Sequence, residues 1–326
     1  MARVFLTRRL PFAEPFAIAG GELEVFPEDR APTAEELARG AAESEAIVAV
    51  LPSRVDAALL ETCPRLRLVA NVAVGFDNVD VAAATARGVW VTNTPDVLTN
   101  ATAELAFALV LATARRLGEA ERLVRGGEWR GFSPSLLLGR ELAGATLGVY
   151  GLGRIGAAVA RLGGAFGMRC LATSGGSRAI GERAHGAEIV DRETLLRESD
   201  VVSIHCPSTP ATRHAFDAAA FAAMKRGALL VNTARGAIVD ERALAEALAS
   251  GHLGGAGLDV FEDEPNVLPA LLAAPNAIVL PHVGSATVTA RTAMARLAFT
   301  DVARVLGGER PLHPVNEPVP FAHEKR

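Results

Sequence analysis

The sequence predicts an α/β protein with two domains, each built on an open, doubly wound parallel sheet. The chain has 326 residues, which is longer than one ordinary domain and favours two. Half of the residues are apolar and 21% are charged, a composition typical of soluble globular proteins. Short apolar runs alternate with helical patterns along most of the chain. Continuous apolar strands separated by helices are typical of parallel sheets that are covered on both faces.

The first series of elements occupies about the first hundred residues. Helical patterns at 55–63 and 78–88 lie between successive apolar runs, as expected for β-strand–helix–β-strand units. The expected strands are 3–6, 46–51, 66–72 and 89–93.

A long helical pattern begins near Thr99 and continues through the charged stretch 115–125. Because this pattern is too long for a simple crossover, we interpret it as a connecting helix between the domains. A loop rich in glycine and serine is expected at 126–140.

The second series of elements opens with a strand at 146–150 and a helix at 154–166. Another helical pattern starts after Asp240, and a last one spans 285–306 before a proline-rich tail. The further strands expected in this series are 168–173, 187–190, 200–206, 228–233, 255–260 and 277–282.

Composition and charge exclude several classes of function. The net charge is −4 and the isoelectric point is about 6.0, whereas nucleic acids and anionic membranes require a basic face. The apolar stretch in residues 1–11 is too short for a signal peptide, and no apolar helix is long enough to span a membrane. The three cysteines lie far apart, so we expect no disulfide framework and a cytoplasmic location. Histidines and carboxylates lack the spacing of a metal site.

A glycine-rich motif follows the strand expected at 146–150. The sequence Gly151-Leu-Gly153-Arg-Ile-Gly156 leads from this strand into a helix, which is the context of a dinucleotide-binding Rossmann fold. The first glycine permits a tight turn, the second lets the backbone approach a pyrophosphate, and the third allows close packing of helix on strand. The alternative is a glycine-rich turn that binds no ligand.

The end of the next strand bears on the choice of cofactor. An acidic residue there would bind the ribose 2′-hydroxyl of NAD, but the sequence has Ser174 at this place, followed by Ser177 and Arg178. An arginine attracts the 2′-phosphate of NADP, which a carboxylate would repel. The pattern favours NADP(H) and leaves NAD(H) possible. Alternatively, Arg178 is a solvated loop residue and the selectivity is loose.

Three polar residues follow successive strands near the end of the second series. Arg235, Glu264 and His282 come after the strands expected at 228–233, 255–260 and 277–282. Because the carboxyl ends of parallel strands share one edge of the sheet, these side chains are candidates for a common site. Each also has a structural alternative: a single histidine after a strand is often structural, and Glu264 before a proline could be an exposed turn residue.

The same residues carry a resemblance to a known family. The stretch NTARGAIVDERALAEALASGHLGGAGLDVFEDEP at 232–265, followed by LPHVGSAT, resembles the D-isomer-specific 2-hydroxyacid dehydrogenases. VAVGFDNVD at 72–80 and GATLGVYGLGRIG at 144–156 extend the resemblance over nearly the whole chain. The segments VFLTRRLP and LTNATAE look most like the glyoxylate/hydroxypyruvate reductase branch.

The resemblance implies a reaction and its residues. The enzyme would reduce a small 2-oxo acid to the 2-hydroxy acid by hydride transfer from NAD(P)H. His282 would act as the acid/base, Glu264 as its partner, and Arg235 would bind the substrate. The backbone at Val74 and Gly75 would meet the substrate carboxylate. Besides the glycines of the motif and the residues at 174–178, the implied cofactor contacts are Thr102, Arg154, Ile155, Cys206, Pro207, Thr212, Thr233, Ala234, Asp259, His282 and Gly284.

The resemblance also implies an organisation. A Rossmann cofactor domain, 99–286, would be inserted into a flavodoxin-like substrate domain formed by 1–98 and 287–326, and the protein would be a homodimer. Alternatives within the family include D-lactate and other D-2-hydroxyacid dehydrogenases. A different class is a non-catalytic NAD(H)-sensing protein like the related corepressors. The sequence does not identify the oxo acid, whose side chain would meet loops near 51–54, 74–76 and 136–138.

Overall fold

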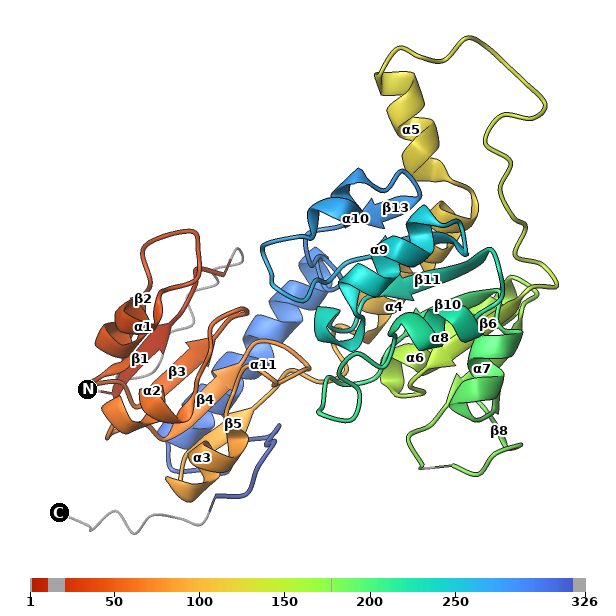
Figure 1. Cartoon of the computed structure of the whole chain (residues 1–326). Helices are drawn as coiled ribbons and strands as arrows, with labels where there is room; N and C mark the ends of the chain where they lie inside the picture. Colours follow the sequence, from red (N-terminus) through yellow and green to blue (C-terminus); the bar gives the residue numbers. More distant parts are fainter. Residues whose placement is uncertain (1, 11–20, 177, 319–326) are drawn as a thin grey trace. The chain divides into compact units, whose positions relative to one another are not determined.

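The computed structural model describes residues 2–10, 21–176 and 178–318, and the chain divides into two compact units (Figure 1). Unit 1 comprises Met1–Leu98 and Ala286–Arg326, and unit 2 comprises Thr99–Ser285. Each unit contains a sheet of mainly parallel strands, so the α/β class expected from the sequence is confirmed.

Unit 1 is built on a five-stranded parallel sheet. Its strand order is β2-β1-β3-β4-β5. The bounds are β1 Ala2–Leu6, β2 Gly21–Val25, β3 Ala46–Ala49, β4 Leu68–Asn71 and β5 Trp90–Thr92. The sequence analysis did not anticipate β2, because its sequence GELEV lacks an apolar run and its residues stay partly exposed at the edge of the sheet.

Four helices accompany this sheet in the described part of unit 1. They are α1 Ala34–Ala41, α2 Ala57–Thr62, α3 Val81–Ala86 and α11 Val288–Leu306. Each begins after a residue whose side chain accepts a backbone N–H of the first turn, which satisfies a donor that the helix leaves open. These N-cap residues are Thr33, Asp56, Asp80 and Thr287. The last helix packs on β3 and β4, so the C-terminal segment completes the core of unit 1.

Unit 2 is built on an eight-stranded sheet of order β13-β12-β11-β10-β6-β7-β9-β8. The bounds are β6 Thr146–Tyr150, β7 Arg169–Thr173, β8 Arg183–Ala184, β9 Ala187–Ile189, β10 Val201–Ile204, β11 Ala228–Asn232, β12 Leu253–Leu258 and β13 Ala277–Val279. The pairing of β8 with β9 is antiparallel, and the other pairings are parallel. The two-residue strand β8 was not expected, because it is too short to give a pattern.

Helices cover both faces of this sheet (Figure 1). Successive residues of β11 show the two faces: Leu230 packs with α7, α8 and α9, whereas Leu229 and Val231 pack with α4 and α6. This alternation is the pleat of a strand buried on both sides. The helices are α4 Thr99–Ala114, α5 Leu117–Arg125, α6 Arg154–Ala165, α7 Arg192–Glu198, α8 Ala218–Ala223, α9 Glu241–Ala249 and α10 Pro269–Ala273, with a 3₁₀ turn at Gly236–Ile238.

The expectation of a single long helix from Thr99 to about Arg125 is wrong. The chain forms α4 and α5, separated by Arg116, whose φ of 53° is left-handed and cannot continue an α-helix. The end of α4 is closed by the returning loop, since the N–H of Arg140 donates to the carbonyl of Ala114 at 2.8 Å. Both segments consist of helix-forming residues, so the pattern alone did not reveal the break.

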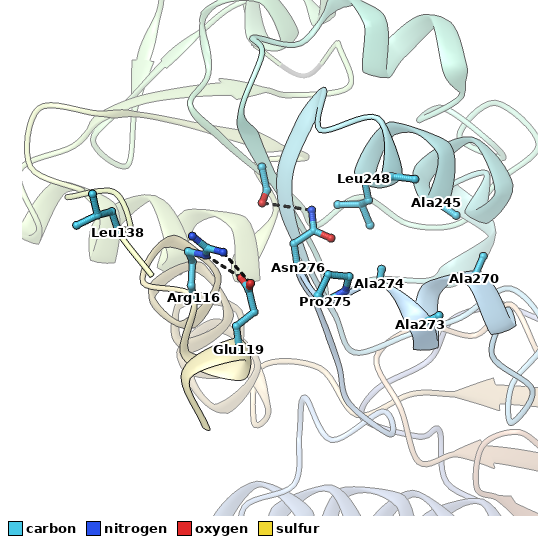
Figure 2. A pocket seen from close by; sticks show the side chains of 12 residues that line it. Arg116, Glu119, Leu138, Ala245, Leu248, Ala270, Ala273, Ala274, Pro275 and Asn276 are labelled. Atoms are coloured by element: carbon cyan, nitrogen blue, oxygen red, sulfur yellow. Dashed lines mark hydrogen bonds and ion pairs between the residues drawn. The ribbon is translucent and has the colours of Figure 1, made fainter. Parts of the chain in front are cut away.

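A cavity of about 730 Å³ lies among α5, α9 and α10 (Figure 2). Arg116 and Glu119 form an ion pair at 2.8 Å on one wall. Gly254, near the start of β12, and Asn276, just before β13, contribute to the lining. The cavity therefore lies at the amino ends of these strands.

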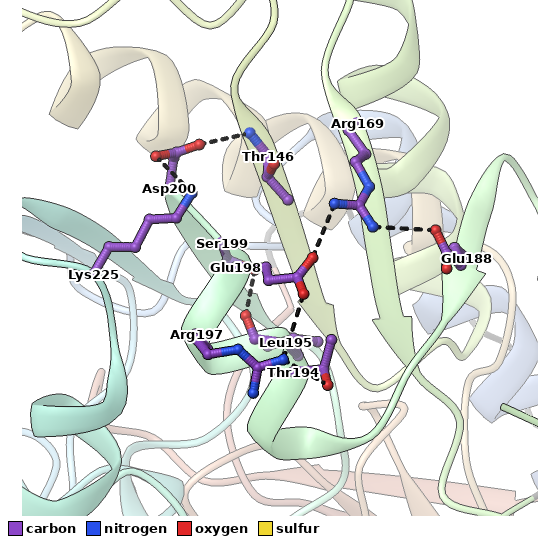
Figure 3. Close-up of polar contacts among 10 residues, drawn as sticks. All are labelled: Thr146, Arg169, Glu188, Thr194, Leu195, Arg197, Glu198, Ser199, Asp200 and Lys225. Carbon is purple, nitrogen blue, oxygen red and sulfur yellow. Dashed lines mark hydrogen bonds and ion pairs between the residues drawn. The ribbon is translucent and has the colours of Figure 1, made fainter. Parts of the chain in front are cut away.

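Polar contacts gather at the same edge of the sheet (Figure 3). Arg169, the first residue of β7, pairs with Glu188 and Glu198 at 3.3 and 2.9 Å. Asp200, just before β10, accepts the N–H of Thr146 at 2.9 Å and pairs with Lys225 at 3.3 Å. Such partly exposed pairs each contribute about 0–1 kcal/mol. These contacts link the amino ends of the strands. The carboxyl ends of the strands remain available to a ligand.

Candidate active site

Three neighbouring strands of unit 2 end beside the three polar residues singled out in the sequence. β11 ends at Asn232, β12 at Leu258 and β13 at Val279, and these strands are adjacent in the sheet. Arg235, Glu264 and His282 follow them within a few residues. The parallel topology thus brings the three residues to one edge of the sheet.

His282 and Glu264 are directly paired. The ring Nδ1 of His282 lies 2.8 Å from Glu264 Oε2, and Glu264 Oε1 accepts the N–H of Phe261 at 3.1 Å. Because Nδ1 is engaged by the carboxylate, Nε2 is the ring nitrogen that remains to exchange a proton with a ligand. Both side chains are about one-third exposed, so a small molecule can reach the pair.

Glu264 is ionised at neutral pH. Burial opposes its charged form, but the hydrogen bond and charge of His282, the N–H of Phe261 and the charge of Arg235 hold the pKa of Glu264 below its usual value of 4.5. The ionised carboxylate therefore accepts a hydrogen bond from the imidazole Nδ1 beside it. The contribution of Arg235 also indicates that its guanidinium lies near this pair.

The backbone that carries His282 is strained and firmly held. His282 has a φ of 54°, a left-handed value that non-glycine residues seldom adopt. Its N–H donates to the carbonyl of Asp259 at 2.9 Å. The buried carboxylate of Asp259 accepts the N–H groups of Val283 and Gly284 at 2.8 and 2.7 Å. Burial raises the pKa of Asp259, although these donors and His282 oppose that shift.

Arg235 is placed by a compact turn after β11. Asn232 Nδ2 donates to the carbonyl of Arg235 at 2.9 Å, and Asn232 Oδ1 accepts the N–H of Ala234 at 3.0 Å. A Cβ on Gly236 would lie 1.9 Å from the carbonyl carbon of Phe261, so only glycine allows this turn to pack against the loop that leads to Glu264. The sequence analysis did not single out Asn232 or Gly236; the only signal was an amide at the end of a buried strand.

The glycine-rich motif forms the turn between β6 and α6. Gly151 has a φ of 104°, and a Cβ there would lie 2.6 Å from the backbone nitrogen of Cys206. A Cβ on Gly156 would lie 2.2 Å from the carbonyl oxygen of Gly151. Gly153 differs, since a Cβ would have no heavy atom within 4 Å. The first and third glycines of the motif therefore pack closely against other backbone atoms. The middle glycine, Gly153, is open to the outside. It lies at the start of a helix whose N–H groups attract anions.

The loop after β7 contains no carboxylate where NAD-binding proteins place one. Ser174 Oγ donates to the carbonyl of Arg178 at 3.3 Å, and Arg178 is exposed, with Nη2 3.5 Å from His185 Nε2. Ser177, expected to contact the cofactor, lies outside the described residues.

The other residues expected at the cofactor lie around the same edge. Cys206 and Pro207 follow β10, and Thr212 Oγ1 closes their loop by donating to the carbonyl of Pro207 at 2.7 Å. Burial raises the pKa of Cys206 to about 11, so its thiol is neutral. Thr233 and Ala234 follow β11, Arg154 and Ile155 begin α6, and Thr102 lies in α4 near Gly284. Val74 and Gly75 belong to unit 1, where they follow β4.

These features fit a nicotinamide dinucleotide. The open position beside Gly153 allows a pyrophosphate to approach the backbone. The hydroxyl of Thr233 is buried and has no hydrogen-bond partner among the described residues, which is costly unless a ligand supplies one. Within residues 2–10, 21–176 and 178–318, no group of three or more His, Cys, Asp or Glu residues is arranged to hold a metal ion. In the same ranges, no helix has the length and hydropathy of a membrane span.

A glycine-rich turn at the start of a helix and a histidine–carboxylate pair, both at the carboxyl edge of one parallel sheet, are typical of nicotinamide-dependent dehydrogenases. Comparison with known proteins identifies the family. The family model described as "D-isomer specific 2-hydroxyacid dehydrogenase, NAD binding domain" matches residues 107–284. The chain belongs to the D-isomer specific 2-hydroxyacid dehydrogenase family and is an NAD(P)-dependent oxidoreductase, which confirms the resemblance seen in the sequence.

Individual relatives support this assignment along the whole chain. The glyoxylate reductase of Thermococcus litoralis is 44% identical over 97% of each chain. The crystal structure of the TT0316 protein from Thermus thermophilus is 43% identical, with a TM-score of 0.89 over 96% of this chain and 100% of that one. An NADPH-dependent glyoxylate/hydroxypyruvate reductase from Sinorhizobium meliloti, in complex with NADP and malonate, is 35% identical, with a TM-score of 0.83 and 98% of each chain covered.

Proposed function

We propose that this enzyme reduces glyoxylate or hydroxypyruvate to the corresponding 2-hydroxy acid at the expense of NAD(P)H. The observation that carries the proposal is the His282–Glu264 pair, 2.8 Å apart at the carboxyl edge that also bears the glycine-rich turn. Relatives named glyoxylate reductase, 44% identical over nearly the whole chain, support the choice of a small 2-oxo acid.

The residues of the site have complementary roles in this reaction. A bound nicotinamide supplies the hydride. His282 donates a proton from Nε2 to the carbonyl oxygen of the substrate, and a placed acid of this kind contributes on the order of 10²–10⁴ in rate. Glu264 keeps the ring oriented through its contact with Nδ1. Arg235 binds the carboxylate and carbonyl oxygen, for which the planar guanidinium is suited. In unit 1, the backbone at Val74 and Gly75 binds the substrate carboxylate.

NADP(H) is the cofactor that we propose. The absence of a carboxylate at Ser174 and the exposed guanidinium of Arg178 support this preference. The test compares kcat/KM for NADPH and NADH in the wild type and in Arg178→Ser. We expect a preference for NADPH that weakens in the variant. A strong preference for NADH in the wild type would contradict the proposal.

We also propose that the enzyme is a cytoplasmic homodimer. Unit 2 exposes large apolar side chains along α5 and the loop that follows, including Trp129, Phe132 and Leu138, which are 55%, 91% and 68% exposed. Exposed apolar groups gathered in one segment commonly mark a protein interface. Figure 1 shows this segment standing away from the sheet of unit 2. Sedimentation analysis should find a dimer that Phe132→Asp weakens, and a monomeric wild type would contradict this assembly.

The substrate is tested with a panel of oxo acids. NAD(P)H oxidation is followed with glyoxylate, hydroxypyruvate, pyruvate and phosphohydroxypyruvate, each with both cofactors. We expect the highest kcat/KM with glyoxylate or hydroxypyruvate. A higher value with pyruvate would favour a D-lactate dehydrogenase. No oxidation with any 2-oxo acid would contradict the proposal and favour a cofactor-sensing protein.

A further inference from the structure

The loop after β4 in unit 1 has three consecutive carbonyl groups that are all engaged by the unit itself. The carbonyl of Ala73 accepts the N–H of Thr94 at 2.9 Å. The carbonyl of Val74 accepts Asn93 Nδ2 at 2.8 Å, and that of Gly75 accepts Asn71 Nδ2 at 2.8 Å. Two asparagine side chains therefore fix the orientation of two successive peptide groups.

This arrangement determines where the N–H groups of the loop point. The peptide bonds after Val74 and Gly75 are trans, and in a trans peptide the N–H points opposite to the C=O. The N–H groups of Gly75 and Phe76 thus point away from Asn93 and Asn71. Within the described part of the chain, nothing accepts a hydrogen bond from either of them. Phe76 itself is 41% exposed.

We infer that Asn71 and Asn93 are positioning residues that direct the N–H groups of Gly75 and Phe76 toward the substrate carboxylate. This inference rests on the proposed function, which places a 2-oxo acid at this loop. Adjacent backbone N–H groups that point to the same side bind anions well. Because both peptide groups are fixed before a ligand arrives, binding requires little reorganisation of the loop.

The Asn71 side chain and the Asn93 backbone are themselves held in place. Asn71 is 1% exposed, and its Oδ1 accepts Asn78 Nδ2 at 3.0 Å. Asn78 Nδ2 also lies 3.0 Å from the carbonyl of Ser53, so the contacts of Asn78 set which way the Asn71 amide faces. On the other side, the N–H of Asn93 donates to the carbonyl of His313 at 3.3 Å. The Asn71 amide therefore belongs to a hydrogen-bond network, and the backbone of Asn93 is anchored to the C-terminal segment.

The test replaces each amide by the isosteric acid. Asn71→Asp and Asn93→Asp remove the donor and place a carboxylate oxygen against a carbonyl oxygen. We expect KM for glyoxylate to rise about tenfold or more, because misdirected N–H groups lose their hydrogen bonds to the charged carboxylate. We expect kcat at saturation and Kd for NADPH to stay within about twofold.

A third buried asparagine provides the matched control. Asn316 is 9% exposed and lies in unit 1, where its Nδ2 donates to the carbonyl of Val89 at 3.0 Å, just before β5. Asn316→Asp should lower the melting temperature and leave KM unchanged. If Asn71→Asp and Asn93→Asp also left KM at the wild-type value in an active enzyme, the inference would be overturned.

A binding measurement on the wild type does not depend on the folding of any variant. Malonate, a carboxylate that cannot be reduced, is titrated into the NADP⁺-bound enzyme while the backbone amide resonances are recorded. We expect the resonances of Gly75 and Phe76 to move most. Such shifts in a protein that reduces no 2-oxo acid would uphold the inference and refute only the proposed function. Binding of malonate that leaves both resonances unmoved, or no binding at all, would overturn the inference.

Discussion

At the scale of single residues, the contacts of His282 are asymmetric. Glu264 occupies Nδ1, and the backbone around the histidine is fixed by hydrogen bonds to Asp259. The strained φ of His282 is maintained because several hydrogen bonds fix the backbone in this conformation. One defined ring nitrogen, Nε2, therefore remains available to a ligand, as is required of a proton donor.

The effect of pH follows from the shifted pKa of Glu264. Since this pKa is lowered from 4.5, the carboxylate is ionised throughout the neutral range, and its contribution to stability is lost only as the pH falls through the lowered value. Glu264→Gln removes the carboxylate that titrates in the acid range and pairs with His282. In the wild type we expect the reduction rate to decline at acid pH as Glu264 is protonated, and we expect this decline to be absent from the variant. Profiles of kcat/KM that superimpose would contradict this role.

The arginine makes a separate prediction about substrate affinity. Arg235→Lys keeps the charge but loses the two-pronged geometry, so KM for the oxo acid should rise about tenfold while Kd for NADPH is unchanged. Arg242→Lys, at an exposed position of α9, is the control and should leave KM unaltered. An unchanged KM in Arg235→Lys would exclude a role of Arg235 in binding the substrate.

Arg235, Glu264 and His282 could be named from the sequence because each follows a strand with a clear apolar pattern. Asn71, Asn93 and Asn232 could not, because their partners are backbone carbonyls and N–H groups whose positions exist only in the folded chain. The role of Asp259 could be predicted from the sequence only in part. The family resemblance implied a cofactor contact for this residue, and the structure adds that both of its carboxylate oxygens accept backbone N–H groups of the loop after His282.

At the scale of elements, helix α6 shows how the glycines divide their roles. The open position beside Gly153 predicts that Gly153→Ala folds as well as the wild type, because φ and ψ of −81° and −165° are accessible to alanine. Its methyl group would nevertheless obstruct the pyrophosphate, so Kd for NADPH should rise about tenfold.

Gly164 in the same helix is the matched control for this test. A Cβ there also has no heavy atom within 4 Å. Gly164→Ala should therefore retain the wild-type Kd and gain up to about 1 kcal/mol of stability, as expected for alanine within a helix. Equal affinities in the two variants, measured by fluorescence titration, would contradict cofactor binding at Gly153.

The elements that the sequence predicted best are the buried ones. β10 and β11 have continuous apolar runs and were located to within two residues at each end. The peripheral strands β2 and β8 lack such runs, and their pairing depends on a sheet edge formed by other parts of the chain. The break at Arg116 was missed for a related reason, because the loop that returns to the end of α4 is distant in sequence.

At the scale of the whole molecule, the residues to which the proposed function assigns roles are distributed over both units. Unit 2 contains the glycine-rich turn, the histidine–glutamate pair and the arginine, whereas unit 1 contains the loop with two outward N–H groups. The helical segment after Ser285 returns the chain to unit 1, so that the first and last parts of the sequence share one core. In the sequence, unit 2 thus lies between the two segments of unit 1.

The central claim is that His282 transfers the proton during hydride transfer from a bound nicotinamide. The most direct test is a single-turnover measurement of NADPH oxidation by glyoxylate in the wild type and in His282→Ala, with Kd for NADPH measured in parallel. The account predicts that the rate falls on the order of 10²–10⁴ while Kd stays within about twofold. Turnover near the wild-type rate in the alanine variant would contradict it.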